Sequence, residues 1–254
     1  MCLILFSWKN HTVYKLILAA NRDEFYTRPT KKAGFWEDHP HILGGRDLEA
    51  GGTWLGLTKE GRFTAITNYR DPSIKKENAP SRGALTTDFL NGDESPADYL
   101  DRINKHGDQY YGFNLLVGDG EELWYYSNIN REARELVSGS YGLSNALLDT
   151  AWPKLDLGHQ LFKDSISNGK PDENSLLEIL ENNHKPDDEK LPSTGVPYEW
   201  EKAISSMFIE TETYGTCCST ILMIDHQNRA RFVEKTYPVG KRIGGTEQYE
   251  IELG

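Results

Sequence analysis

The sequence predicts an α+β protein built around a largely antiparallel sheet. Short apolar runs occur in pairs near the start of the chain, amphipathic helical segments dominate its middle, and strand-like runs return near its end. A hydrophobic fraction of 37% with 11% aromatic residues is typical of a globular chain. Because no linker-like stretch or internal repeat interrupts this order, we expect residues 1–254 to form a single domain.

Two hairpins are predicted in the first part of the chain. Residues 2–8 and 13–21 are apolar runs separated by a short polar stretch, and residues 53–58 and 62–68 form a second such pair. Residues 26–52 hold two prolines and two glycine pairs, which indicate a long loop. A loop of this length in a compact domain is more often functional than idle.

Helix signals mark the middle of the chain. Ser95 is a predicted N-cap followed by Pro96 in the first turn, and Asp172 is a second predicted cap. Helices are expected over residues 82–91, 96–106, 152–168 and 173–183, with an exposed loop over 184–198. Further strands are expected near residues 112–118, 121–128, 141–145, 218–225, 229–235 and 247–253.

The charge balance argues against nucleic acid as a partner. The formal net charge is −11, and no cluster of lysine or arginine reverses it locally. No stretch approaches the roughly 20 apolar residues of a membrane span, so we expect no integral membrane association. The three cysteines Cys2, Cys217 and Cys218 cannot form a disulfide framework, which favours a reducing compartment and a cytoplasmic location.

Cys2 is the first candidate for chemistry. It follows Met1 directly, and its small side chain permits removal of that methionine. The thiol would then belong to a residue with a free α-amine, whose pKa of about 7.7–8.0 suits a general base at neutral pH. Nucleophile and base would come from one residue. The alternative is a small thiol buried on a first strand.

A polar tetrapeptide, Asn21-Arg22-Asp23-Glu24, ends the second apolar run. In a strand, Asn21 and Asp23 share one face, while Arg22 and Glu24 share the other. The first hairpin would bring this strand end to Cys2, where an aspartate could orient a terminal ammonium and modulate its pKa. The alternative is an ion-pair cluster at the rim of a strand.

Two asparagines close predicted strands. Asn68 ends the second hairpin, and Asn145 ends the short run near residues 141–145. Asparagine amides can stabilise a developing oxyanion, although asparagine also ends strands because it suits turns. Trp54 could line an apolar pocket or pack in the core.

Several motifs together resemble one known family. They are Met1-Cys2, residues 18–29 (LAANRDEFYTRP), 51–56 (GGTWLG), 67–69 (TNY), 112–115 (GFNL) and 141–145 (YGLSN). Over nearly its whole length the chain is similar to the NRDE family, also called the transport and Golgi organisation protein 2 family. That family is associated with haem mobilisation and with lipid homeostasis, without a settled reaction.

A more distant resemblance links the same motifs to the bile-salt hydrolase and penicillin V acylase group. It implies an N-terminal nucleophile hydrolase-like αββα sandwich with two largely antiparallel sheets and a terminal cysteine nucleophile. The catalytic residues that it implies are Cys2, Asp23, Asn68 and Asn145. The Asn-x-Asp match also includes Asn21, and we predict that Asn21, Arg22 and Trp54 bind substrate or support the site.

Two positions depart from these patterns. The hydrolase group carries arginine just before its Asn-x-Asp, where this chain has Ala20, and we expect Arg22 to point to the opposite face of the strand. The NRDE family commonly carries arginine where this chain has Cys217. A thiol cannot supply the fork of donors that arginine provides. We expect Cys217 and Cys218 to be buried strand thiols.

Two functional hypotheses follow. In the first, the protein is an N-terminal cysteine hydrolase that cleaves an acyl amide or related acyl compound through an acyl-thioester intermediate, with no cofactor and no metal. In the second, it retains the hydrolase fold but binds haem or lipid in a trafficking role without catalysis. The expected partner is a small acyl-type molecule or haem, and the oligomeric state stays open.

Overall fold

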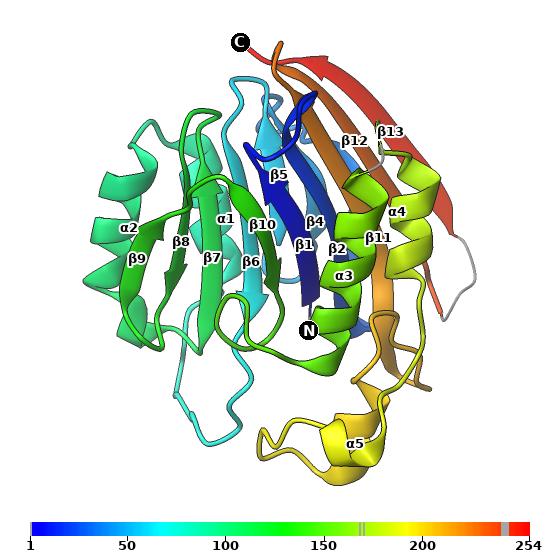
Figure 1. The fold of residues 1–254 in the computed structure, drawn as a ribbon. Coiled ribbons are helices and arrows are strands. Elements are labelled where there is room, and N and C mark those ends of the chain that lie inside the picture. The colour runs from blue at the N-terminus through cyan, green and yellow to red at the C-terminus, as the bar shows by residue number, and fades with distance from the viewer. Residues whose placement is uncertain (1, 168, 170, 240–243) are drawn as a thin grey trace. The chain divides into compact units, whose positions relative to one another are not determined.

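The computed structural model confirms the α+β class. Its strands form two antiparallel sheets, and its helices pack against them (Figure 1). The structure describes residues 2–167, 169, 171–239 and 244–254. The chain divides into two compact units, the first comprising residues 1–27 and 138–250 and the second comprising residues 28–137 and 251–254.

The sheet of the first unit is built on the hairpin predicted at the start of the chain. β1 (Cys2–Trp8) and β2 (Tyr14–Phe25) pair antiparallel. On its other side, β2 pairs with β11 (Tyr214–Asp225). The strand order is β10-β1-β2-β11-β12-β13, where β10 is Gly139–Leu143, β12 is Arg229–Thr236 and β13 is Gly245–Glu252.

Helices α3 (Pro153–Ser167) and α4 (Glu173–Leu180) cover one face of this sheet (Figure 1). The core beneath them includes Leu3 and Leu5 of β1 and Ile17 and Ala19 of β2. Odd-numbered side chains of β1 and β2 therefore face the helices. As predicted, the Asp172 side chain caps α4. The unit also contains the short helix α5 (Tyr198–Ala203) and a 3₁₀ turn at Asp188–Lys190.

The second unit holds its own sheet and core. β5 (Leu55–Thr58) and β6 (Phe63–Asn68) form the second predicted hairpin, on which helices α1 (Gly83–Asn91) and α2 (Pro96–Asn104) pack. Ser95 caps α2 as predicted, accepting a hydrogen bond from the Asp98 backbone N–H at 3.1 Å. The strand order is β3-β4-β5-β6-β7-β8-β9. The strands not yet introduced are β3 (Thr30–Phe35), β4 (Ile42–Asp47), β7 (Phe113–Gly118), β8 (Leu123–Ser127) and β9 (Glu132–Glu135). A 3₁₀ turn spans Gly107–Gln109.

The predicted loop over residues 26–52 is wrong. These residues contain β3 and β4, which pair at the edge of the second sheet. The exposed Lys31 and Lys32 and a register shift between Lys31 and Gly34 hide the two-residue period of β3. The short polar strand β9 and the helix α5 also lie outside the predicted elements.

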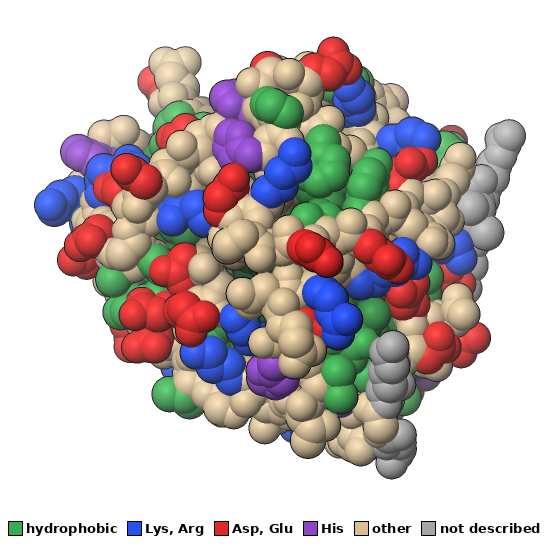
Figure 2. Space-filling view, turned by 90° about the horizontal axis from the view of Figure 1, so that it is seen from above, with side chains coloured by type: hydrophobic (Ala, Val, Ile, Leu, Met, Phe, Trp, Pro, Cys, Tyr) green, Lys and Arg blue, Asp and Glu red, His purple; other side chains and the backbone are tan. Residues whose placement is uncertain are grey.

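The surface carries mixed charge. On the face shown in Figure 2, acidic and basic side chains are interspersed and do not gather into large patches of one sign. Among the described residues, no helix combines the length and the apolar character that a membrane crossing requires.

Truncating the core beneath α4 should destabilise the protein. Leu176 is fully buried in the cluster between the helices and the first sheet, so we expect Leu176→Ala to lower the free energy of unfolding by about 2–5 kcal/mol. Urea denaturation followed by circular dichroism measures the loss. The control is Val13→Ala, at an exposed side chain, which should change stability by about 0.5 kcal/mol or less. Equal losses in the two variants would contradict this placement of the core.

Candidate functional site

The register of β1 and β2 decides which side chains accompany Cys2. Cys2 lies directly opposite Arg22, and Leu3 lies opposite Asn21. Directly opposed residues of an antiparallel pair place their side chains on the same face. Arg22 therefore shares the face of Cys2, while Asn21 lies on the face that carries the helices. Arg22 does point away from Asn21, as expected, but this direction takes it toward Cys2.

A third strand completes this cluster of side chains. On β11, Cys218 lies opposite Arg22, and a register shift between Thr216 and Cys218 leaves Cys217 at a bulge. Arg22 thus lies between Cys2 and Cys218 on three adjacent strands. Two interstrand spacings, roughly 9–10 Å, are too long for a disulfide between these cysteines. All three thiols are free.

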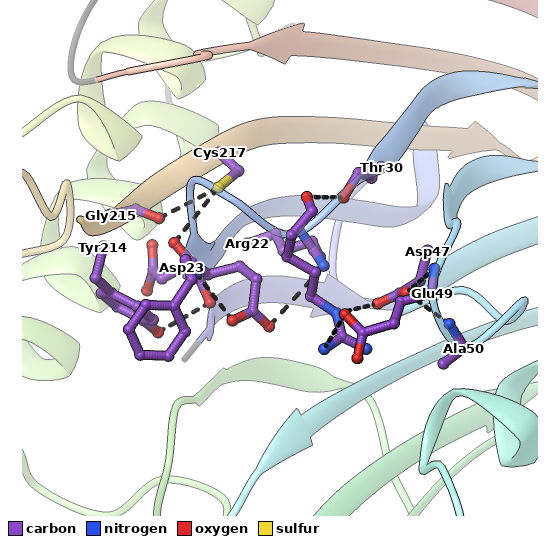
Figure 3. Close-up of polar contacts among 12 residues, drawn as sticks. Arg22, Asp23, Thr30, Asp47, Glu49, Ala50, Tyr214, Gly215 and Cys217 are labelled. Atoms are coloured by element: carbon purple, nitrogen blue, oxygen red, sulfur yellow. Dashed lines mark hydrogen bonds and ion pairs between the residues drawn. The ribbon is translucent and has the colours of Figure 1, made fainter.

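Cys217 differs from the buried strand thiol that the sequence predicts. It is only partly buried, whereas Cys218 is buried as expected. The Cys217 sulfur lies 3.5 Å from the Gly215 carbonyl and 3.6 Å from the Glu24 carbonyl (Figure 3). Burial raises the pKa of Cys217 to about 11, although Arg22 lowers it. The bulge in β11, rather than the alternation of a regular strand, explains why the Cys217 thiol is only partly buried.

Arg22 brings a buried cation to Cys2. Burial alone would lower the pKa of Arg22, but Cys218, Cys2 and Glu24 raise it above its usual value. The nearest carboxylate oxygen of Glu24 is 4.0 Å from the guanidinium. Burial raises the pKa of the Cys2 thiol, while the positive amino terminus and Arg22 lower it. The guanidinium therefore opposes the effect of burial on the thiol.

Asp23 lies in a buried network of hydroxyl groups. The Thr216 hydroxyl donates to Asp23 Oδ1 at 2.7 Å. The Tyr214 hydroxyl donates to the Asp23 main-chain carbonyl at 2.9 Å (Figure 3). Burial raises the pKa of Asp23, whereas the positive amino terminus, Lys154 and the Thr216 hydrogen bond lower it. Asp23 also acts on Cys2, because its charge raises the pKa of the thiol and its backbone N–H lowers it.

Asn21 fixes main chain rather than facing Cys2. Its amide nitrogen donates to the Leu180 carbonyl at 2.8 Å and to the Met207 carbonyl at 3.0 Å. Its amide oxygen accepts from the Ser219 hydroxyl at 2.6 Å. Asn21 therefore joins β2 to the end of α4, to β11 and to the segment that precedes β11.

The end of β10 reaches the start of β1. Leu143 lies opposite Ile4, and the hydroxyl of the next residue, Ser144, donates to the Cys2 carbonyl at 3.0 Å. Asn145 follows Ser144 and is fully buried. The predicted residue Asn145 is thus brought to the neighbourhood of Cys2.

The other two predicted residues belong to the second unit. Asn68 ends β6, where it lies opposite Phe113 and is half-buried. Trp54 packs against the core cluster around Phe89 and Leu115, in keeping with the core alternative. The first unit accordingly brings together Cys2, Asn21, Arg22, Asp23 and Asn145.

Three residues of this network were not among the sequence candidates. Thr216 and Tyr214 contact Asp23, and Lys154 lowers its pKa. Thr216 lies in the segment Gly215-Thr216-Cys217-Cys218, in which Cys217 departs from the family pattern. That departure was the signal in the sequence that could have pointed to Thr216. Nothing in the local sequence around Lys154 points to a residue on β2.

A separate cavity lies within the second unit. It has a volume of about 470 Å³ and is lined by residues of β3, of β4 and of the segment between them, including Trp36 and Arg46. The Arg46 guanidinium stacks 4.2 Å over the Trp36 ring and forms two bonds to Asp38, at 2.6 and 2.8 Å. Because this charge is compensated within the cavity wall, the cavity is a weaker candidate than the network at Cys2.

The fold and the site together define an α+β protein with a cysteine at the start of its first strand, held beside a buried guanidinium and a buried carboxylate. A family model described as Transport and Golgi organisation 2 matches residues 1–238. The chain belongs to this family, which confirms the resemblance seen in its motifs.

The relatives cover nearly the full chain. The Transport and Golgi organization protein 2 homologs of Bos taurus and Homo sapiens are 38% and 37% identical to it, over 93% of this chain and 93% of each relative. Transport and Golgi organization protein 2 of Drosophila melanogaster is 31% identical over 93% of this chain and 92% of its own.

One solved structure, a Caenorhabditis elegans N-acylethanolamine-hydrolyzing acid amidase ortholog, aligns with 87% of this chain and 92% of its own at 12% identity. The TM-score is 0.43, which is too low to establish a shared fold.

Removing the Arg22 charge should make Cys2 a weaker acid. We expect Arg22→Gln to raise the pKa of the Cys2 thiol. At a pH below this pKa the thiolate fraction falls about tenfold for each unit by which the pKa rises, so alkylation by iodoacetamide slows. Peptide mass spectrometry distinguishes Cys2 from the other thiols. Arg229→Gln is the matched control, since this exposed guanidinium pairs with Asp225. An unchanged rate in Arg22→Gln would show that the guanidinium does not act on the thiol.

Proposed function

We propose that the protein is an N-terminal cysteine hydrolase that cleaves an acyl amide or a related acyl compound. The observation that carries this proposal is the position of Cys2 at the start of β1, beside Arg22 and Asp23. Membership of the family supports it only through the shared motifs. The hydrolase-like αββα arrangement is part of the same proposal.

The reaction starts from the mature amino terminus. After Met1 is removed, the main-chain nitrogen of Cys2 becomes a free α-amine, which takes the proton of the thiol. The sulfur attacks the acyl carbon and a C–S bond forms. The C–N bond of the amide then breaks, and the α-ammonium returns the proton to the leaving amine. Water, deprotonated by the same amine, attacks the thioester and releases the acid and the thiol.

The neighbours of Cys2 divide the remaining tasks. Asp23 orients the α-amine, and Arg22 favours the thiolate because its positive charge lies on the same face. Asn145 donates to the developing oxyanion, and the resemblance to the hydrolase group implies the same function for Asn68. Asn21 supports the end of β2 through its hydrogen bonds. Trp54 supports the second unit through its packing against the core. The reaction uses no metal and no cofactor.

A covalent trap tests the proposal. Purified protein is treated with p-nitrophenyl acetate, and intact mass and peptide mapping locate any acetyl group. We expect a single acetyl group on Cys2 in protein that has lost Met1, and none at this position in Cys2→Ala. Asp23→Asn should lower the rate at least tenfold, because the α-amine loses its orienting group.

Two results would contradict the proposed hydrolase function. One is a protein that retains Met1 in its native host, since no free α-amine would then exist at Cys2. The other is acetylation that is equally fast in a variant with leucine inserted between Met1 and Cys2, where the bulky residue prevents methionine removal. The second result would identify ordinary thiol reactivity.

The names of the relatives favour a second candidate function. They refer to transport and Golgi organisation, which fits a trafficking protein that binds haem or an acyl lipid without turnover. Such a protein should bind its ligand equally well in Cys2→Ala. A spectral titration with haem that shows no saturable shift would count against the haem version.

The three free thiols support a reducing location, which we propose to be the cytoplasm.

A further inference from the structure

The pairing of β1 with β10 changes character at the end that carries Cys2. The two strands pair as far as Ile4, which lies opposite Leu143. Two steps further, the same register would set Cys2 opposite Asn145. β10 ends at Leu143, however, and the chain bends at the next residue. Within the described chain, the main-chain ladder on this side therefore ends at Ile4, two residues after the proposed nucleophile.

The Ser144 side chain extends this pairing to Cys2. Its hydroxyl donates to the Cys2 main-chain carbonyl at 3.0 Å, and Ser144 is buried. A hydrogen bond to a main-chain carbonyl in a buried place is costly to lose, because the carbonyl cannot turn to water instead. A side chain thus supplies the link between the first residue of β1 and the end of β10 that the main chain no longer makes.

The loop that carries Ser144 is closed by its own hydrogen bonds. The Asp149 backbone N–H donates to the Gly142 carbonyl at 2.8 Å, and the Gly142 backbone N–H donates to Asp149 Oδ1, also at 2.8 Å. Asp149 has a φ of 59°, a left-handed conformation that aspartate adopts more readily than most residues. These bonds fix the far end of the loop to β10, so Ser144 is held between two attached points.

The same hydroxyl lies next to Asn145. The Ser144 oxygen is 3.5 Å from Asn145 Oδ1, a longer contact than the one with the Cys2 carbonyl, so the hydroxyl proton is committed mainly to Cys2. Asn145 is itself fully buried, with its amide oxygen on the side of Ser144. One hydroxyl therefore contacts both the residue that carries the thiol and the amide that we propose to stabilise the oxyanion.

A nucleophile at the amino terminus needs such an anchor more than one within the chain. Once Met1 is removed, no preceding peptide holds Cys2, and the terminal residues of a chain fray most readily. On one side of Cys2, β2 pairs with it through Arg22. On the other side, the Ser144 hydroxyl bonds to its carbonyl. The main chain of Cys2 is thus held from both directions along the sheet.

We propose that Ser144 is a positioning residue of the site: its hydroxyl holds the main chain of Cys2 against the end of β10, so that the thiol attacks an acyl carbon whose oxygen lies at the Asn145 amide. This role rests on the proposed hydrolase function. It assigns a task to the serine of the Tyr-Gly-Leu-Ser-Asn motif, which reaches Cys2 over a sequence separation of 142 residues.

Two rates measured on the same thiol separate position from reactivity. Acetylation of Cys2 by p-nitrophenyl acetate is favoured by a donor at the acyl oxygen, whereas alkylation by iodoacetamide depends on the thiolate alone. In protein that has lost Met1, we expect Ser144→Ala to slow acetylation about tenfold or more and to leave alkylation within about twofold of the wild-type rate. Ser144→Thr keeps the hydroxyl and should restore most of the acetylation rate.

The matched control removes a similar hydrogen bond elsewhere. The buried Thr64 hydroxyl on β6 also donates to a main-chain carbonyl, that of Leu116, at 2.8 Å. Thr64→Val should leave both rates unchanged. An unchanged acetylation rate in Ser144→Ala, or an equal fall of acetylation and alkylation, would overturn the proposal. If Ser144→Ala does not fold, Ser144→Cys, which keeps only a weak donor, takes its place and is judged by the same two rates.

Hydrogen exchange tests the anchor without relying on turnover. In Ser144→Ala we expect the amides of a peptide spanning residues 2–8 to exchange about tenfold faster or more than in the wild type and in Thr64→Val, because the start of β1 frays. Unchanged exchange in this peptide would contradict an anchoring role. If the wild-type protein is not acetylated at Cys2, the hydrolase proposal fails, while the exchange rates still decide whether Ser144 holds Cys2.

Discussion

The compensation of charges buried around the Asp23 carboxylate is the constraint on which the site depends. Asp23, Arg22 and Lys154 are all buried, and a charge removed from water is tolerated only beside its opposite. Burial raises the pKa of Asp23, and the amino terminus, Lys154 and Arg22 each oppose that rise. These positive charges therefore all act in the same direction on the pKa of this carboxylate.

The bulge in β11 lets this sheet satisfy two polar residues of β2 at once. With Thr216 opposite Asp23, a regular register would place Cys218 opposite Asn21. The extra residue, Cys217, moves Ser219 into that position, where its hydroxyl bonds to Asn21 at 2.6 Å. Both hydroxyls thus meet their partners. The bulge makes the strand irregular, as is often found beside functional sites, and it leaves the Cys217 thiol partly exposed.

Local patterns in the sequence predict much of this arrangement. The hairpin of β1 and β2, the alternation of Asn21 and Asp23, and the caps Ser95 and Asp172 each follow from neighbouring residues. What could not be predicted depends on register or on distant segments. The position of Arg22 beside Cys2 requires the exact pairing of two strands, the bulge requires a third strand, and Lys154 lowers the pKa of Asp23 from α3, far along the chain. The edge strand β3 could not be predicted because its exposed lysines interrupt the two-residue alternation that indicates a strand.

The most direct measurement is a crystal structure of the protein, purified from its native host, after reaction with a small acyl donor such as p-nitrophenyl acetate. We expect Met1 to be absent and continuous density to join Cys2 Sγ to the acyl carbon. The α-amine should lie within hydrogen-bond distance of the Asp23 carboxylate, with an asparagine amide about 2.7–3.1 Å from the acyl oxygen. An intact Met1, or an acyl group on Cys217 with Cys2 unmodified, would contradict the assignment of Cys2 as the nucleophile.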